Sequence, residues 1–87
     1  MTDEELKVLL LRELRKIAPE AELDEIEPAA DLRQQIDLDS MDLLNFMIAI
    51  HAATGVDIPE ADYPKLATLR DAIGYLRARM EGAAKPS

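Results

Sequence analysis

The 87-residue chain has no cysteine, no tryptophan, three glycines and a single histidine, His51. Without cysteine there is neither a disulfide framework nor a thiolate metal site, and one histidine argues against a histidine-based metal site. The short length and the 3% aromatic content allow one modest hydrophobic core. We therefore expect one domain that folds by packing alone and holds no metal of its own.

Long apolar runs are also absent. No stretch approaches the roughly 20 apolar residues that cross a bilayer. The first residues, Met1 to Glu5, are acidic, whereas a secretory signal begins with basic residues. We expect a soluble, cytoplasmic protein with no membrane span.

Positive charge is scarce, and the negative charge is concentrated in one segment. Residues 20–42 contain nine acidic residues and one basic residue, Arg33, so this segment carries the whole net charge of −8. Phosphate contacts need a basic surface, so this balance opposes nucleic-acid binding and favours a protein partner with a basic patch. A charge run is most often a solvated loop, and charge alone does not decide between the two interpretations.

Helical periodicity and capping signals predict the elements. Thr2 and Glu5 fit a capping box for a first helix that ends before Pro19. A second helix is expected over residues 40–54, where Gly55 closes it. A short, irregular helix with Pro64 inside it is expected over residues 60–65, and a last helix from Thr68 to about residue 81.

The rest of the chain completes the predicted fold. Residues 19–39 are expected to form a long ordered loop, because apolar residues recur in it as anchors: Leu23, Ile26, Leu32 and Ile36. No strand alternation is present. The expected fold is all-α, a small four-helix bundle of three longer helices and one short one, with one domain over residues 1–81 and a flexible tail over residues 82–87.

The helix expected at residues 40–54 has more apolar surface than one stripe needs. Its core stripe is Leu43, Phe46, Met47 and Ile50, at helical spacing, and a second apolar row lies beside it: Met41, Leu44 and Ile48. A central helix can bury several faces, and an exposed row can bind a partner. The pattern leaves both possibilities open.

Ser40 stands at the start of this helix, among the carboxylates of the segment Asp37 to Asp42. His51 cannot activate it as a nucleophile, because eleven residues of helix separate the two by about 16 Å. The segment is no EF-hand either, since Asp42 and Ile48 replace the required glycine and glutamate. Asp39 or Ser40 can cap the helix, and the Ser40 hydroxyl can accept a covalent phosphodiester, an anion that a helix N-terminus favours.

The sequence around Ser40 resembles a known family, the acyl carrier proteins. Asp39-Ser40-Met41 resembles their Asp-Ser-Leu motif, and residues on both sides follow the family's order and spacing nearly to the C-terminus. These residues are Ala30-Asp31-Leu32 and Ile36 before the serine, and Val56-Asp57-Ile58-Pro59, Asp62, Lys65-Leu66, Thr68-Leu69 and Asp71-Ala72-Ile73 after it.

The resemblance implies that Ser40 receives 4′-phosphopantetheine from coenzyme A through a phosphopantetheinyl transferase, with Asp39 and Met41 beside it. Asp39 and Asp42 would lie near the magnesium that assists the transfer. The chain would then be a monomeric carrier without catalytic activity of its own, serving ketosynthase, acyl-transfer or acyl-ligase enzymes. The implied docking residues are Asp42, Leu44, Asn45, Ile48 and His51, beside Met41, and the implied lining of an acyl pocket is Leu43, Phe46, Met47, Ile58 and Leu66.

The sequence also departs from the family pattern. Asn45, His51 and Ala52 stand where the bacterial fatty-acid carriers usually have glutamate, Asp37 replaces a usual glycine, and Pro64 interrupts the short helix. We therefore expect a specialised carrier in fatty-acid, lipid or polyketide-type biosynthesis that docks by apolar contact as much as by charge. The alternatives are a peptidyl or aminoacyl carrier, and a small acidic interaction module in which Ser40 only caps a helix.

Overall fold

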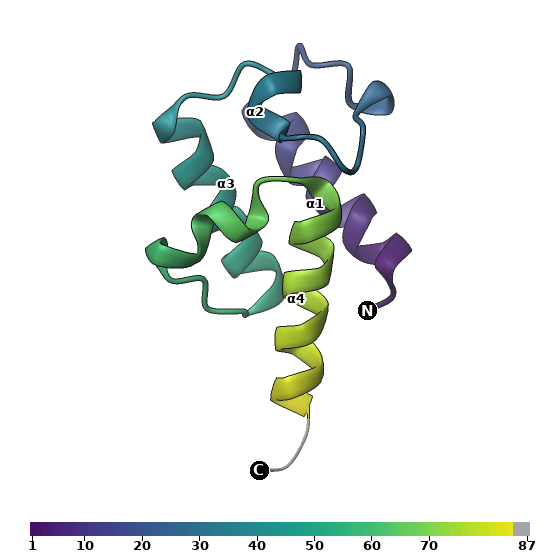
Figure 1. Ribbon diagram of the computed structural model, residues 1–87, viewed down its shortest axis with the longest axis vertical. Coiled ribbons are helices and arrows are strands. Elements are labelled where there is room, and N and C mark those ends of the chain that lie inside the picture. Colours follow the sequence, from purple (N-terminus) through teal and green to yellow (C-terminus); the bar gives the residue numbers. More distant parts are fainter. Residues whose placement is uncertain (85–87) are drawn as a thin grey trace.

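The computed structural model describes the backbone of residues 1–84 and the side chains of residues 1–80. Its helical elements are, in chain order, α1 (Asp3–Ile17), η1 (Leu23–Glu25), α2 (Leu32–Gln35), α3 (Ser40–Thr54), η2 (Glu60–Leu66) and α4 (Leu69–Ala84), of which η1 and η2 are 3-10 helices. Helix α1 packs against both α3 and α4, and η2 packs against α4 (Figure 1). The predicted all-helical bundle is confirmed.

The helix ends follow from local sequence signals. The Thr2 hydroxyl accepts a hydrogen bond from the Glu5 N–H at 3.1 Å, and the Glu5 carboxylate accepts one from the Thr2 N–H at 2.9 Å. At the other end of the chain, Thr68 Oγ1 accepts from the Asp71 N–H at 3.0 Å. Gly55 ends α3 with φ of 75°, a left-handed conformation that glycine adopts at little cost. The predicted capping box and both predicted caps are therefore present.

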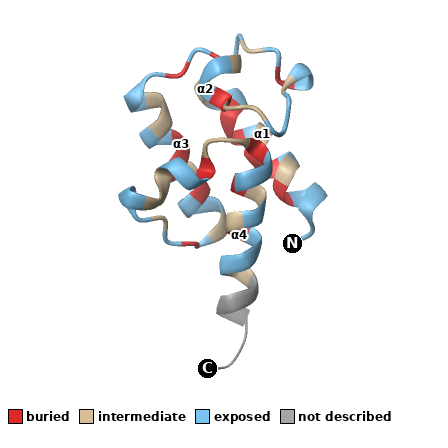
Figure 2. Ribbon diagram, viewed as in Figure 1, coloured by how far each residue is buried: buried red, intermediate tan, exposed pale blue. Residues whose placement is uncertain are grey.

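One hydrophobic core fills the space between α1, α3, α4 and the shorter elements, and Figure 2 shows its buried residues in red along the helices and the loops between them. Its fully buried large side chains are Leu6, Leu10, Leu14, Leu32, Phe46, Met47, Ile50, Leu66, Leu69 and Leu76. The predicted loop anchors also belong to it: Leu23, Leu32 and Ile36 are buried and Ile26 packs against the core.

The segment before α3 is ordered, as predicted, but the prediction of an uninterrupted loop is wrong. It contains η1 and the one-turn helix α2. The Gln35 side chain ties α2 to the loop, because its amide accepts from the Glu27 N–H and donates to the carbonyl oxygens of Glu27 and Ala30. A helix of four residues is too short to show helical periodicity in the sequence, which is why it was missed.

Helix α4 continues to Ala84, a little beyond the predicted end near residue 81. Gly82 to Ala84, which were predicted to begin the flexible tail, are helical. Residues 85–87, the remainder of that predicted tail, lie outside the described residues. Within the described part of the chain, no helix has the length and apolarity needed to span a membrane.

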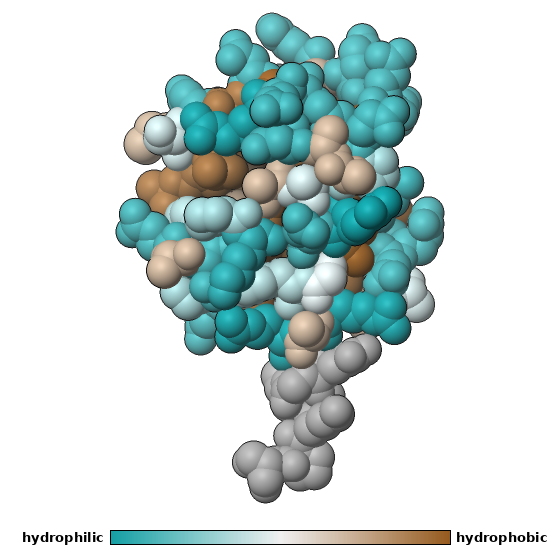
Figure 3. Space-filling model, viewed as in Figure 1, coloured by the Kyte–Doolittle hydropathy of each residue, from teal (hydrophilic) through white to brown (hydrophobic). Residues whose placement is uncertain are grey.

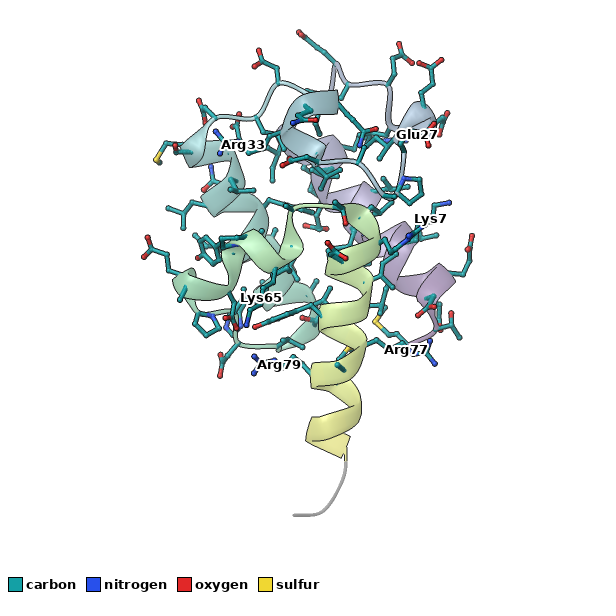
Figure 4. The ribbon with its side chains drawn as sticks, in the orientation of Figure 1. Lys7, Glu27, Arg33, Lys65, Arg77 and Arg79 are labelled. Carbon is teal, nitrogen blue, oxygen red and sulfur yellow. The ribbon has the colours of Figure 1, made fainter. Side chains whose placement is uncertain are left out.

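The 3-10 helix η2 is fastened to α4 through Asp62. The Asp62 carboxylate accepts a hydrogen bond from the Tyr75 hydroxyl at 2.7 Å and lies 3.1 Å from the Arg79 guanidinium and 3.2 Å from Lys65 Nζ. The Arg79 guanidinium also stacks 4.8 Å from the centre of the Tyr75 ring. Figure 4 shows Lys65 on η2 and Arg79 on α4 at the same side of the bundle. This cluster holds an element whose own hydrogen bonding is limited by Pro64.

The cluster around Asp62 makes the stability of the fold depend on pH. The hydrogen bond from Tyr75, followed by the contacts with Lys65 and Arg79, holds the pKa of Asp62 below its ordinary value of 3.8. Because the pKa is depressed in the folded state, the contribution is present above pH 3.8 and is lost as the pH falls through the folded-state pKa. We expect Asp62→Asn to lower stability near neutral pH, with a difference from the wild type that shrinks in acid.

Urea unfolding of both proteins across this pH range measures the effect. Asp24→Asn, which changes an exposed carboxylate outside the cluster, is the matched control. A difference between Asp62→Asn and the wild type that stayed constant from neutral to acidic pH would contradict the assignment.

Candidate functional site

Ser40 is the first residue of α3, and it is exposed. Asp39, not Ser40, caps the helix: Asp39 Oδ1 accepts from the Asp42 N–H at 2.8 Å, and Asp42 Oδ2 accepts from the Asp39 N–H at 3.3 Å. These reciprocal bonds form a capping box with aspartate in place of glutamate at its third position. The Ser40 hydroxyl is therefore not needed to hold the helix together.

Leu38 holds the backbone segment that leads into Ser40, and this role was not predicted from the sequence. Its side chain is buried in the core, whereas Asp37, Asp39 and Ser40 are exposed. An inward leucine between outward acids positions the segment and turns the serine toward solvent. The signal was the local alternation Asp37-Leu38-Asp39, which is too short to stand out from a loop.

The surroundings of Ser40 fit a covalently bound phosphodiester. Within the described residues, no side chain or backbone group makes a hydrogen bond to the Ser40 hydroxyl. The capping box and the Leu43–Asp39 backbone bond occupy the N–H groups of Asp42 and Leu43. The N–H groups of Ser40 and Met41 come earlier in the turn, where an α-helix supplies no partner, and an anion is favoured there.

The second apolar row of α3 is exposed. Met41, Leu44 and Ile48 are 63%, 38% and 55% exposed, whereas Phe46, Met47 and Ile50 of the core stripe are buried and Leu43 is partly buried. Figure 3 shows apolar atoms gathered over the first half of α3, between polar atoms of the preceding loop and of η2. The structure thus decides the question left open by the sequence in favour of an exposed row.

The polar residues predicted to belong to the docking face flank this row. Asp42 is half-buried in the first turn of α3, and Asn45 and His51 are exposed. His51 lies near the C-terminal end of α3, with Nδ1 2.9 Å from the carbonyl oxygen of Val56 and 3.6 Å from Asp57 Oδ1. The labelled cations Lys7 and Arg77 lie on the opposite side of the molecule from α3 (Figure 4).

The residues predicted to line an acyl pocket belong to the core or pack against it. Phe46 and Leu66 are fully buried in the packed core, and Leu43 and Ile58 pack against it from partly buried positions. Met47 and Ile58 instead line an open recess of about 350 Å³ between α3 and the segment that includes η2. Its other lining residues are Ile48, His51, Asp57, Pro59 and Tyr63.

Metal ligands are not clustered in the described part of the chain. No group of three or more histidine, cysteine, aspartate or glutamate side chains is arranged there to hold a metal ion. The carboxylates of Asp39 and Asp42 are each engaged with a backbone N–H of the capping box.

Comparison with known proteins places this geometry in context. The family model described as "Phosphopantetheine attachment site" matches residues 6–76, which is most of the chain. This range includes α1 from Leu6 onward, Ser40, α3, η2 and the first half of α4.

Two curated relatives agree with the family match. An acyl carrier protein of Rubrobacter xylanophilus is 31% identical over 52 residues, which are 60% of this chain and 64% of that protein. An acyl carrier protein of Lactobacillus acidophilus is 29% identical over 59 residues, 68% of this chain and 74% of that protein. The first match therefore spans slightly less than two thirds of the relative's length.

Proposed function

The chain belongs to the acyl carrier protein family, whose prosthetic group is 4′-phosphopantetheine, and we propose that Ser40 is the residue that bears this group. Proteins of this family are carriers and not catalysts. The proposed chemistry at Ser40 takes place within a phosphopantetheinyl transferase. The serine hydroxyl attacks the phosphorus atom of coenzyme A that bears the pantetheine, and the P–O–P bond of the pyrophosphate breaks. A phosphodiester forms at Ser40, 3′,5′-adenosine bisphosphate leaves, and the hydroxyl proton passes to a base of the transferase.

One observation carries this proposal: the Ser40 hydroxyl is exposed at the start of α3 while Asp39 does the capping. A serine that capped the helix would lose its hydrogen bond on modification, and the helix would lose stability. Here the hydroxyl can be esterified without cost to the fold. The arm's terminal thiol then carries acyl groups as thioesters, and every other chemical step belongs to the partner enzymes.

We place the docking face on α3, with Met41, Leu44 and Ile48 as its apolar part and Asp42, Asn45 and His51 along its sides. The exposure of the apolar row supports this placement, because surface helices ordinarily bury one stripe and leave the rest polar. The acidic segment that precedes α3 favours partners with a basic patch beside an apolar one. Candidate partners are phosphopantetheinyl transferases, ketosynthases, acyltransferases and acyl ligases.

A salt series tests whether this carrier is specialised. The α3 face bears Asn45, His51 and Ala52 where strongly acidic carriers have carboxylates, so its contacts depend less on charge. We expect weaker binding to general bacterial fatty-acid synthase enzymes than a strongly acidic carrier shows, and a smaller loss of affinity as salt rises from 0.05 to about 0.5 M. Calorimetric titration of both carriers against the same ketosynthase measures this.

Equal affinities together with equally steep salt dependences would refute the specialised role, while leaving the carrier function intact. The variant Asn45→Glu is a useful companion, because Asn45 is exposed and a carboxylate there restores charge without touching the core. It should steepen the salt dependence.

The cargo separates an acyl carrier from a peptidyl or aminoacyl carrier, since both use the same arm. The names of the two relatives favour acyl cargo. We propose intermediates of fatty-acid, lipid or polyketide-type biosynthesis. The mass of the intact protein isolated from its native host, before and after thioester cleavage with hydroxylamine, tests this directly: an aminoacyl or peptidyl hydroxamate in the released fraction would overturn the assignment of acyl cargo.

A further inference from the structure

A recess of about 460 Å³ lies beside α4, and we call it the α4 recess. Its lining residues include Arg70, Gly74 and Arg77 of α4, Asp3 at the start of α1 and Pro28 of the loop before α2. The Arg70 N–H donates a hydrogen bond to the Pro28 carbonyl oxygen at 2.9 Å, which holds this loop against α4. Figure 4 shows Arg77 on the opposite side of the molecule from α3, and no described residue of α3 lines the recess. The α4 recess is therefore separate from the proposed attachment site and docking face.

The α4 recess is locally basic in a chain of net charge −8. Arg70 and Arg77 line it, and Asp3 is the one carboxylate among its described lining residues. The Arg70 side chain is exposed and makes no ion pair within the described residues. Arg77 pairs with Asp3 at 2.9 Å, but the two side chains are 50% and 60% exposed, and an exposed pair contributes little to stability. A carboxylate from a partner can therefore bind Arg70 and compete with Asp3 for Arg77.

The two arginines lie on one face of α4, two turns apart. Seven residues separate them, which corresponds to about 10 Å of helix rise. Each guanidinium presents a planar fork of donors that can bind a carboxylate through two hydrogen bonds. Two carboxylates seven residues apart on a second helix have the same spacing. A helix that lies along α4 can therefore pair with both arginines.

Gly74 lies between the two arginines, inside α4. A glycine there makes a helix less stable than an alanine would. Its backbone does not need glycine, because its φ is not positive, and a Cβ at Gly74 would have no atom within 4 Å. The packing of the described chain thus does not explain this glycine. The space that it leaves in the recess allows another chain to approach α4 closely.

We propose that the α4 recess binds an acidic helix of a partner protein. Two carboxylates of that helix, seven residues apart, pair with Arg70 and Arg77, and an apolar side chain between them packs over Gly74. The partner binds on the side of the molecule away from α3, so Ser40 stays accessible while it is bound. The inference goes beyond the proposed function and does not depend on it, because the recess contains neither Ser40 nor any part of the docking face.

A second copy of the chain fits the α4 recess less well than a different protein does. No helix of the described chain bears two acidic residues seven positions apart. The acidic segment 20–42 offers only η1 and α2 before α3 begins, with three and four residues. Two copies of net charge −8 also repel each other.

The probe is an alanine- and glutamine-based peptide of roughly 15 residues, the length at which such sequences become helical. It carries two glutamates seven residues apart and a leucine midway between them, and it is titrated into ¹⁵N-labelled protein. We expect saturable shifts of the Gly74 amide signal and none at Gly55, which ends α3 outside the recess. One control peptide has glutamines in place of the glutamates, and another has the glutamates three residues apart. Equal shifts with either control, or no shift at Gly74 up to millimolar peptide, would overturn the proposal.

Charge variants test the assigned pairs. Arg70→Ala should weaken binding of the peptide by roughly two- to fivefold, the effect of one exposed ion pair. Arg33→Ala is the matched control, because it removes an exposed arginine of α2 that does not line the recess, and it should leave binding unchanged. Asp3→Asn removes the carboxylate that competes for Arg77, so it should strengthen binding. Equal losses in the two arginine variants, or weaker binding in Asp3→Asn, would contradict the assignment.

Gly74→Ala separates binding from the stability of α4. The added methyl group has open space in the free protein and favours the helix, so the urea midpoint should rise. The same methyl group occupies part of the recess, so the affinity for the peptide should fall by roughly fivefold or more. Unchanged affinity in a more stable variant would contradict close approach at Gly74.

Two further measurements separate this proposal from the alternatives. Ser40→Ala protein should bind the peptide like the wild type, so failure of the α4 recess proposal is distinguishable from failure of attachment at Ser40. Sedimentation of the chain alone tests whether a second copy is the occupant. We expect a monomer at all concentrations; self-association that Arg70→Ala abolishes would identify a second copy and overturn the proposal.

Discussion

Ser40→Ala is expected to abolish phosphopantetheinylation completely, since the substitution removes the only hydroxyl at the start of α3. The assay is the intact mass of the protein after incubation with coenzyme A, magnesium and a broad-specificity phosphopantetheinyl transferase. The chain contains one other serine, Ser87, so Ser87→Ala is the matched control and should be modified like the wild type. Modification of Ser40→Ala would show that another residue bears the arm.

The loss must not come from unfolding, and the structure predicts that it does not. The Ser40 side chain is exposed, and Asp39 and Asp42 supply the capping box. A change at an exposed position without such contacts alters stability by about 0.5 kcal/mol or less. Urea unfolding curves of Ser40→Ala and the wild type should therefore nearly coincide. A large drop in stability would mean that the serine has a structural role.

Phe46→Ala should have the largest effect on stability. Phe46 is the single phenylalanine of the chain, lies in the middle of α3 and is fully buried. Truncating such a side chain leaves a cavity and costs about 3–5 kcal/mol. Small domains have only about 5–15 kcal/mol of stability in total. We expect the urea midpoint to fall by about a fifth or more, a rough fraction that follows from these two ranges.

Ile48→Ala is the control for Phe46→Ala, because it removes apolar atoms from the same helix at a position that is 55% exposed. Its cost should be on the order of 0.5 kcal/mol. Similar losses in the two variants would contradict the division of α3 into a buried stripe and an exposed row. A small loss in Phe46→Ala alone would mean that the core adapts to the cavity.

Local signals were enough to predict the long helices. Thr2, Glu5 and Thr68 mark helix starts through bonds to nearby backbone groups, and Gly55 marks an end through its positive φ. Such signals act within a few residues, so a sequence displays them directly. The one-turn helix α2 was missed because it is too short to show periodicity and because, apart from the Asp31 cap, the interactions that hold it are not local. Leu32 bonds to Ala67 and the Gln35 side chain bonds to Glu27, and neither partner is evident from periodicity.

At the candidate site, too, some features could be predicted from the sequence and others required coordinates. The position of Ser40 at a helix start followed from the sequence, whereas the identity of the capping residue was left open between Asp39 and Ser40 and required coordinates. The exposure of Met41, Leu44 and Ile48 also required them, because it depends on which helices cover α3. The recess could not be predicted, since it joins α3 residues to Ile58 and Tyr63 across a turn whose geometry the sequence does not specify.

The proposed function depends on the chemistry of the Ser40 hydroxyl, and one measurement tests it most directly. Wild-type protein is incubated with coenzyme A, magnesium and the transferase, and its intact mass is measured. The modified peptide is then fragmented to locate the added group. We predict a single phosphopantetheine addition, located on Ser40. No addition under conditions in which an established carrier is fully modified, or an addition located on any other residue, would contradict the assignment and leave a small acidic interaction module as the better description.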